Sequence, residues 1–279
     1  MSIALNFLLL SIVLITEGIP RDKCHFGLRS IINEYPTLNC SRMTNADHEE
    51  IEYSWINRIW ITNSDLPVIT ANFTEKFPKL IFFFATNSNI REVKDFAFQN
   101  MQSLHRVELI FNNLTYVAPH IFRNSLKVAS FNLTGNPHLI MPEKRPFLRA
   151  PQLRWLDLRL TNIKAVSKGN FVSLFGLTYL SLAGNLIESL PDGVFHSLRH
   201  LKLLDLANNK LKTLSLNIFT TRQISTALYL GGNPWRCDCA MQPVVRCLIG
   251  YAKDEVKCEE PYSQKWEDFA EAQCCEDID

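Results

Sequence analysis

The sequence predicts an α/β solenoid, in which short strands from successive units stack side by side. Apolar residues recur at a nearly constant step through the middle of the 279-residue chain. The eight cysteines all lie near the two ends, and 47% of the residues are hydrophobic, which suffices for a long core. A constant step indicates units that bury their apolar edges only against their neighbours.

The N-terminal segment has the features of a secretory signal peptide over residues 1–18. The run Ile3–Ile15 is too short to span a bilayer, and Thr16 and Gly18 supply small residues before a cleavage point. The alternative is a buried N-terminal helix. No later stretch is apolar enough for a membrane span, and the C-terminus does not resemble an anchor signal. We therefore expect a secreted, extracellular protein.

Two further features bear on the partners and the compartment. The net charge is +1 and no basic run is present, so nucleic acid is not an expected partner. Four Asn-x-Ser/Thr triplets agree with the secretory route, and they predict N-glycosylation at Asn39, Asn72, Asn113 and Asn132.

The repeated units are 24 residues long, apart from one of 25. Their first residues are Ile56, Leu80, Leu104, Val128, Leu153, Leu177, Leu201 and Ser225. Positions 1, 4, 6, 11 and 14 of each unit are mostly Leu, Ile, Val or Phe. Positions 4 and 6 point to one face of a short strand, and position 5 points to the other. We expect these strands to form one parallel sheet.

Positions 9 and 19 of the units hold the other recurrent side chains. Position 9 is a small polar residue that we expect to turn inward and bond unpaired backbone groups, with asparagine making more bonds than serine or threonine. These residues are Ser64, Ser88, Asn112, Asn136, Thr161, Asn185, Asn209 and Asn233. Position 19 predicts a second apolar stack behind the sheet, formed by Phe98, Phe122, Phe171, Phe195 and Phe219. In the 25-residue unit the corresponding phenylalanine, Phe147, is at position 20.

The pattern L-x-x-L-x-L-x-x-N-x-L resembles the leucine-rich repeat family, in its 24-residue extracellular class. The resemblance covers residues 56 to about 234, and the competing interpretation is an amphipathic helical protein. The resemblance implies a leucine-rich repeat horseshoe, an α/β solenoid with a parallel concave sheet, an irregular or 3-10 convex side, and disulfide-stapled caps. We divide the chain into a signal peptide (1–18), an N-terminal cap (19–55), seven full repeats and a partial eighth (56–234), and a C-terminal cysteine-rich cap (235–279).

The two caps should close the open ends of the solenoid. The stretch N-P-W-x-C-x-C at 233–239 resembles the C-terminal flanking module of secreted leucine-rich repeat proteins. That resemblance implies the pairs Cys237–Cys258 and Cys239 with Cys274 or Cys275, and Trp235 packed on the last repeat. A short helix is expected from Ala240 to about Ala252. The N-terminal cap has two cysteines where the family often has four, and we expect Cys24 to pair with Cys40, a closure worth about 3 kcal/mol.

Cys247 is outside the usual set of cysteines in the C-terminal cap. It can pair with one member of Cys274–Cys275, or one of these three thiols can form a disulfide with another chain. The doubled cysteine also resembles the mosquito family of leucine-rich-repeat immune proteins, in a short form without a coiled coil. This resemblance implies a role in innate immunity and possible disulfide-linked partners.

The expected binding surface is the concave face, formed by positions 3, 5, 7 and 8 of the units. Exposed aromatic residues beside arginine are the usual anchors of protein interfaces. The first predicted patch is Arg58, Trp60, Phe82, Phe84, Arg106, Ile110 and Phe111, and the second is Trp155, Asp157, Arg159, Leu160 and Tyr179. A one-residue register slip would instead turn Phe82 and Phe84 inward, and the N-terminal cap could cover the first strands. A glycan on Asn132 would divide this face.

No pattern points to catalysis. The chain has no Gly-rich phosphate loop, nucleophile elbow or HExxH motif. His196 and His200 lack a third ligand, and the acidic residues Glu108, Asp157 and Asp205 lie on alternate strands, roughly 10 Å apart. We expect no enzyme activity, no cofactor and no metal. The two functional hypotheses are a secreted recognition module for a protein, in innate immunity, and an extracellular matrix, adhesion or guidance protein.

Overall fold

The computed structural model describes residues 23–26, 36–44, 54–220, 226–260 and 264–271. The predicted signal peptide and the doubled cysteine Cys274–Cys275 lie outside these ranges. Among the described residues, no helix has both the length and the apolar character needed to cross a bilayer.

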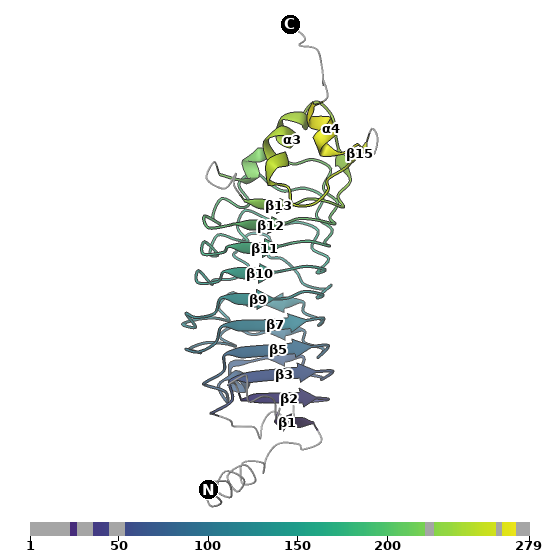
Figure 1. The fold of residues 1–279 in the computed structure, drawn as a ribbon. Helices are drawn as coiled ribbons and strands as arrows, with labels where there is room; N and C mark the ends of the chain where they lie inside the picture. Colours follow the sequence, from purple (N-terminus) through teal and green to yellow (C-terminus); the bar gives the residue numbers. More distant parts are fainter. Residues whose placement is uncertain (1–22, 27–35, 45–53, 221–225, 261–263, 272–279) are drawn as a thin grey trace, which may run out of the picture.

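The molecule is a column of stacked units with a single long sheet along it (Figure 1). The sheet has ten strands, which follow one another in chain order and pair in parallel, except for the antiparallel first pair. The strands are β1 (Cys24–Phe26), β2 (Thr37–Ser41), β3 (Arg58–Thr62), β5 (Phe82–Thr86), β7 (Arg106–Ile110), β9 (Ser130–Asn132), β10 (Trp155–Asp157), β11 (Tyr179–Ser181), β12 (Leu203–Asp205) and β13 (Ala227–Tyr229). The predicted parallel solenoid is confirmed.

The alternation follows the predicted phase in most strands, although the third residues of β10 and β11, Asp157 and Ser181, are buried. In β5 the side chains of Phe83 and Ala85 are fully buried, whereas Phe82 and Phe84 are partly exposed. Because side chains alternate along a strand, this register leaves both of the latter rings on the solvent side. The inward register slip does not occur.

The position-9 residues form a buried ladder, in which each asparagine joins its unit to the one before it. All eight are less than 9% exposed. The Asn185 amide donates to the carbonyls of Leu158 and Leu182, both at 2.8 Å, while its oxygen accepts from the backbone of Thr161 and Ile163. Ser88 makes a single side-chain bond, to the carbonyl of Thr86. Asparagine therefore satisfies more backbone groups than serine, as expected.

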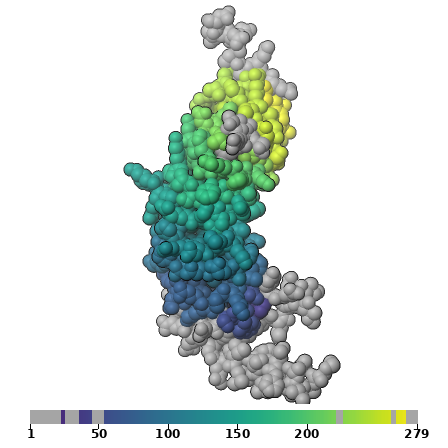
Figure 2. All heavy atoms as spheres, turned by 90° about the vertical axis from the view of Figure 1, so that its left-hand side faces the viewer, coloured from purple at the N-terminus to yellow at the C-terminus, as the bar shows by residue number. Residues whose placement is uncertain are grey.

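Phenylalanine rings form the second layer of the core. Neighbouring rings lie 5.8 Å apart for Phe98–Phe122 and for Phe171–Phe195, and 6.1 Å apart for Phe195–Phe219. These separations suit offset aromatic contacts. Successive units thus pack continuously, and Figure 2 shows them in contact along the whole column.

A small lateral sheet accompanies the first units. It contains β4 (Val68–Ile69), β6 (Glu92–Val93) and β8 (Tyr116–Val117), in parallel. The fourth unit begins to continue it, because Ile140 N donates to the Thr115 carbonyl at 3.1 Å. Residue 142 is a proline and has no N–H for the next bond, so the sheet ends at β8. The only other regular segments between the repeat strands, within the described residues, are α2 (Ala71–Thr74) and the 3-10 turn η2 (Leu216–Ile218).

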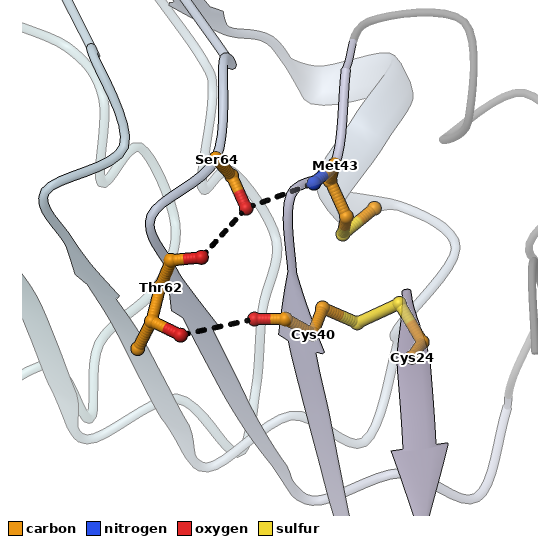
Figure 3. Close-up of a disulfide and its surroundings, with 5 residues drawn as sticks. All are labelled: Cys24, Cys40, Met43, Thr62 and Ser64. Carbon is orange, nitrogen blue, oxygen red and sulfur yellow. Dashed lines mark hydrogen bonds between the residues drawn. A yellow bond between two sulfur atoms is a disulfide. The ribbon is translucent and has the colours of Figure 1, made fainter. Parts of the chain in front are cut away.

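The N-terminal cap extends the main sheet by two strands. β2 pairs in parallel with β3, and β1 turns back antiparallel to β2, where Cys24 and Cys40 form the expected disulfide. Figure 3 shows how Ser64 ties this cap to the first repeat by accepting from Met43 N at 3.0 Å. The described part of the cap lies beside β3 rather than over it.

The C-terminal cap closes the other end of the column (Figure 1). It contains β14 (Trp235–Arg236), α3 (Gln242–Leu248), the 3-10 turn η4 (Ile249–Tyr251), β15 (Cys258–Glu260) and α4 (Trp266–Glu271). The Cys237–Cys258 disulfide is present, as the family resemblance implied. Trp235 is fully buried, and its Nε1 donates to the Leu230 carbonyl at 2.9 Å. The Asp254 carboxylate accepts from Leu230 N and Gly231 N, beside the end of β13.

The remaining cysteines are only partly described. The residues expected to pair with Cys239, namely Cys274 and Cys275, lie outside the described ranges. Cys247 lies half-buried on α3 and forms no disulfide with any described residue. Its predicted bond to Cys274 or Cys275 remains a prediction.

Candidate functional site

The candidate site is the solvent-facing side of the ten-stranded sheet, which we call the concave face. The register aligns equivalent positions of successive units, so residues far apart in the sequence become neighbours. One row contains Arg58, Phe82 and Arg106, and the next contains Trp60, Phe84 and Glu108. Neighbouring strands in such a row are about 4.8 Å apart.

The N-terminal patch consists of Arg58, Trp60, Phe82, Phe84, Arg106, Ile110 and Phe111. The rings of Trp60 and Phe84 have centroids 4.4 Å apart, and the rings of Phe82 and Phe84 are nearly parallel at 6.1 Å. The guanidinium carbon of Arg58 lies 5.0 Å from the centre of the Phe82 ring, within the range of a cation–π contact. Trp60 remains 41% exposed. The structure thus brings Arg58, Trp60, Phe82 and Phe84 together into one aromatic surface.

The third unit completes the N-terminal patch. Arg106 forms an ion pair with Glu108 on the same strand. Ile110 is half-buried, whereas Phe111 is 53% exposed and has a left-handed backbone, with φ of 52°. The Phe111 ring lies on Gly135 of the next unit, where an added Cβ would be 2.2 Å from Phe111 Cδ1. A glycine is therefore needed at residue 135 for the ring to lie flat.

The C-terminal patch is more polar. The rings of Trp155 and Tyr179 stack at 3.4 Å with 7° between their planes. Arg159 holds the Asp157 carboxylate with two nitrogens, and the shortest of these bonds is 2.7 Å. Asp157 is only 1% exposed, so the expectation of an exposed carboxylate at this position is wrong. The reason is that the Arg159 side chain folds back over it, which sequence spacing cannot reveal.

Burial changes the acid–base behaviour of the C-terminal patch. The pKa of Asp205 is raised, chiefly because burial disfavours its charged form, although Ser181 and Ala207 N donate to it. Burial likewise raises the pKa of Tyr179, with a further contribution from the charge of Asp157. The hydrogen bond to Asp157 raises the pKa of Arg159. The protonated hydroxyl of Tyr179 and the Arg159 guanidinium, which is held by Asp157, can therefore donate hydrogen bonds to a ligand.

Two of the predicted glycosylation sites lie on the concave face. Asn39 of β2 is next to Trp60 in the register, and Asn132 of β9 is next to Asp157. Both side chains are partly exposed. The other two, Asn72 on α2 and Asn113 after β7, are exposed and lie outside the main sheet.

Comparison with known proteins agrees with this architecture. A family model described as leucine rich repeat matches residues 175–234. A second, described as a BspA type leucine rich repeat region, matches residues 69–144. The chain is a leucine-rich repeat protein.

Solved structures of other leucine-rich repeat proteins share the fold. The crystal structure of human 5T4, also named trophoblast glycoprotein and Wnt-activated inhibitory factor 1, is 22% identical with a TM-score of 0.65, and the match covers 86% of this chain and 95% of that chain. A chain in the structure of the Toll–Spätzle complex from Drosophila is 20% identical with a TM-score of 0.56. That match covers 65% of this chain and 24% of the other, so this chain spans about a quarter of the latter. At these identities the likeness shows the fold alone.

The leucine-rich repeats contain one feature that sequence reasoning missed. Position 8 of every unit has a left-handed backbone, with φ between 48° and 75°. Asparagine and glycine tolerate this conformation, and they hold most of these positions. The full set is Asn63, Asn87, Phe111, Gly135, Leu160, Gly184, Asn208 and Gly232. The recurrence of Asn and Gly at position 8 was the sequence signal for this left-handed backbone. Phe111 and Leu160 are the two exceptions.

The leucine-rich repeat face shows no cluster suited to a metal. Among the described residues, no group of three or more His, Cys, Asp or Glu side chains could hold a metal ion. The ring of His196 lies 3.0 Å from the Asn217 carbonyl and 3.1 Å from that of Phe219. This histidine therefore joins two neighbouring units.

Proposed function

We propose that this leucine-rich repeat protein is an extracellular recognition module that binds a protein partner through the N-terminal patch of its concave face. The observation that carries the proposal is the contact between the rings of Trp60 and Phe84, which both lie on the solvent side of a regular sheet. Tryptophan, tyrosine and arginine dominate the binding energy of protein interfaces. Their fixed positions on strands reduce the entropy lost on binding.

We further propose that the biological setting is innate immunity. The structure of the Toll–Spätzle complex, which shares the fold, is described as a molecular hub in Drosophila development and innate immunity. The disulfides of both caps support an oxidising, extracellular location. A matrix, adhesion or guidance role would use the same surface but a different distribution in tissue.

The test combines cross-linking with localisation. The full chain, secreted with a C-terminal tag, is incubated in the native extracellular fluid and cross-linked, and the cross-linked peptides are identified by mass spectrometry. We expect one protein to be joined to residues that flank β3, β5 and β7. Cross-links confined to segments outside the main sheet would overturn the proposed surface.

The immune setting is tested separately by measuring the amount of the protein in circulating fluid. We expect it to circulate and to rise after infection. A protein that stays in the insoluble tissue fraction, with no change on infection, would favour the matrix or guidance role.

A further inference from the structure

The middle of the concave face carries a row of small side chains between two rows of larger ones, and we call this row the trough. In β9 and the turn after it, the solvent-facing residues are Ser130, Asn132 and Thr134, which are all small or polar, while the next residue, Gly135, lies under the Phe111 ring. On one side lie Arg106, Glu108 and Phe111 of the third unit, and on the other lie Trp155, Arg159 and Leu160 of the fifth. The trough separates the two aromatic patches.

Trp155 forms a flat apolar wall of this trough. Its ring is stacked against Tyr179 on the side away from β9. On the β9 side, its neighbour in the register is Ser130, which is too small to cover an indole. Trp155 consequently remains 42% exposed. One indole face is open toward the trough, where a planar apolar surface is costly to leave in water.

Asn132 lies on the floor of the trough with its amide nitrogen unused. Its Oδ1 accepts from Thr134 N at 2.9 Å and from Thr134 Oγ1 at 2.7 Å. Both bonds engage the oxygen, and Nδ2 donates to no described residue. Asn132 and Trp155 are one strand and two residues apart, a diagonal of about 8 Å. A single sugar ring linked to Nδ2 spans that distance.

We propose that Asn132 carries an N-linked glycan whose first N-acetylglucosamine packs against the open face of Trp155. The pyranose ring has an apolar face of C–H groups that matches an indole, and its polar edge would remain in water. The acceptor motif Asn132-Leu133-Thr134 is complete. A glycan that lies against Trp155 obstructs the C-terminal patch, which favours the N-terminal patch as the surface for the protein partner.

The modification requires a lipid-diphosphate-linked oligosaccharide as the donor in the secretory pathway. Nδ2 of Asn132 forms a bond to C1 of the N-acetylglucosamine that is attached to the diphosphate. The bond from that C1 to the diphosphate oxygen breaks, the diphosphate leaves with the electron pair, and the amide proton passes to a base of the transferase. No oxidant or reductant is needed. The inference rests on the secretory route in the proposed function, but not on the partner.

The test uses the full chain secreted from a eukaryotic host behind an exogenous signal peptide, with no partner present. Glycopeptide mass spectrometry reads the occupancy of Asn132, and hydroxyl-radical labelling reads the exposure of each tryptophan. We expect a modified Asn132, and labelling of Trp155 at least about twofold slower than in Thr134→Ala, because one indole face is covered. Labelling of Trp60 serves as the internal standard between the wild-type protein and Thr134→Ala and should not change, because both keep the acceptor Asn39 beside it.

Matched variants separate the glycan from other effects. Thr134→Ser keeps the acceptor motif and should keep Trp155 protected, whereas Asn132→Gln should expose it. Asn72→Gln removes an acceptor on α2 and should leave Trp155 unchanged. Enzymatic removal of glycans from the folded wild-type protein should raise Trp155 labelling, which keeps the test valid if a variant fails to fold.

An unmodified Asn132 would overturn the proposal, and so would equal Trp155 labelling in the wild-type protein and in Asn132→Gln. Loss of partner binding by a variant of the N-terminal patch would not affect either measurement. The proposed function and this inference can therefore fail separately.

Discussion

The buried asparagine at position 9 is one of the side chains that join neighbouring units. Asn185 bonds backbone groups of the fifth unit and of its own, and it is 3% exposed. Replacing it by alanine leaves several buried backbone groups without partners. We expect Asn185→Ala to lower the free energy of unfolding by about 3 kcal/mol or more.

Urea unfolding monitored by circular dichroism measures this effect. Asn185→Ser is the matched control, because serine serves at the same position in Ser64 and Ser88. Asn185→Ser should lower the free energy of unfolding by less than Asn185→Ala does. A loss below about 1 kcal/mol for alanine would show that water replaces the amide.

Phe111 illustrates a residue kept at a cost to stability. Its left-handed backbone disfavours a bulky side chain by roughly 1–2 kcal/mol, whereas asparagine accepts it. Both Phe111→Asn and Phe111→Ala remove the ring, so comparing them isolates the backbone. We expect the asparagine variant to be more stable than the alanine variant by about 1 kcal/mol in thermal unfolding. Equal stability would mean that the backbone of residue 111 adjusts freely.

Asp205 should make stability depend on pH. Its folded-state pKa is raised by burial, so the folded protein binds this proton more tightly than the unfolded chain does. At pH values above the folded-state pKa, the ionised Asp205 therefore lowers the free energy of unfolding. This penalty disappears as the pH falls through that pKa. Asp205→Asn should stabilise the protein at neutral pH by less than about 1 kcal/mol, because the group is partly exposed.

Denaturation of Asp205→Asn and wild type across pH 3–8 checks this sign. The advantage of the variant should shrink on acidification, as wild-type Asp205 takes up its proton. An advantage that grows toward low pH would contradict the account.

Among the elements, β1 depends most on a covalent link. It has three residues and pairs with one neighbour, β2, to which the Cys24–Cys40 disulfide ties it. A short edge strand of this kind is weakly held without the link. We expect Cys24→Ser/Cys40→Ser to lower the free energy of unfolding by about 3 kcal/mol.

Hydrogen exchange would locate that loss. Amide protection should fall in β1 and β2 and stay unchanged in β11 and β12. A uniform fall over all repeats would mean that the caps and repeats unfold as one unit.

The elements differ in how far their sequence predicts them. The strands of the repeats were predictable, because the spacing of Leu177, Leu180 and Leu182 recurs in every unit and fixes which side chains are buried. The strand β2 was not predicted, because it precedes the first recognisable unit and lacks the repeat's asparagine. Its parallel pairing with β3 depends on contacts across the cap, and no local pattern encodes those contacts.

The sequence predicted which side of the sheet Trp60 and Phe84 occupy, but not the geometry of the candidate site. Alternation along the strand placed Trp60 and Phe84 on the solvent side, and the register then brought their rings together. The burial of Asp157 was not predictable, since it results from the conformation of the Arg159 side chain. The left-handed backbone of Phe111 was visible only as an exception in a column of Asn and Gly.

At the scale of the whole molecule, the column separates cohesion from recognition. Leucine, phenylalanine and asparagine side chains point inward and join the units, and the solvent-facing rows are free to vary. The two halves of the concave face differ in character: aromatic rings and arginine dominate the first three repeats, whereas the later ones combine the Trp155–Tyr179 stack with hydrogen-bonded carboxylates. The proposed function assigns the partner to the first half.

That assignment also limits where carbohydrate can be attached. Asn39 lies next to Trp60 in the register, so a glycan there would cover part of the N-terminal patch. The account therefore requires Asn39 to be largely unmodified in the protein that binds its partner.

The most direct test of the central claim is the affinity of a variant of the N-terminal patch for the partner identified by cross-linking. Trp60→Ala/Phe84→Ala removes the exposed ring pair, and Phe175→Ala removes a ring that is 51% exposed outside the sheet. By calorimetry or surface plasmon resonance, we expect the double variant to bind at least about tenfold more weakly, and Phe175→Ala to match wild type. Wild-type affinity in the double variant, with the loss in Phe175→Ala instead, would contradict the account.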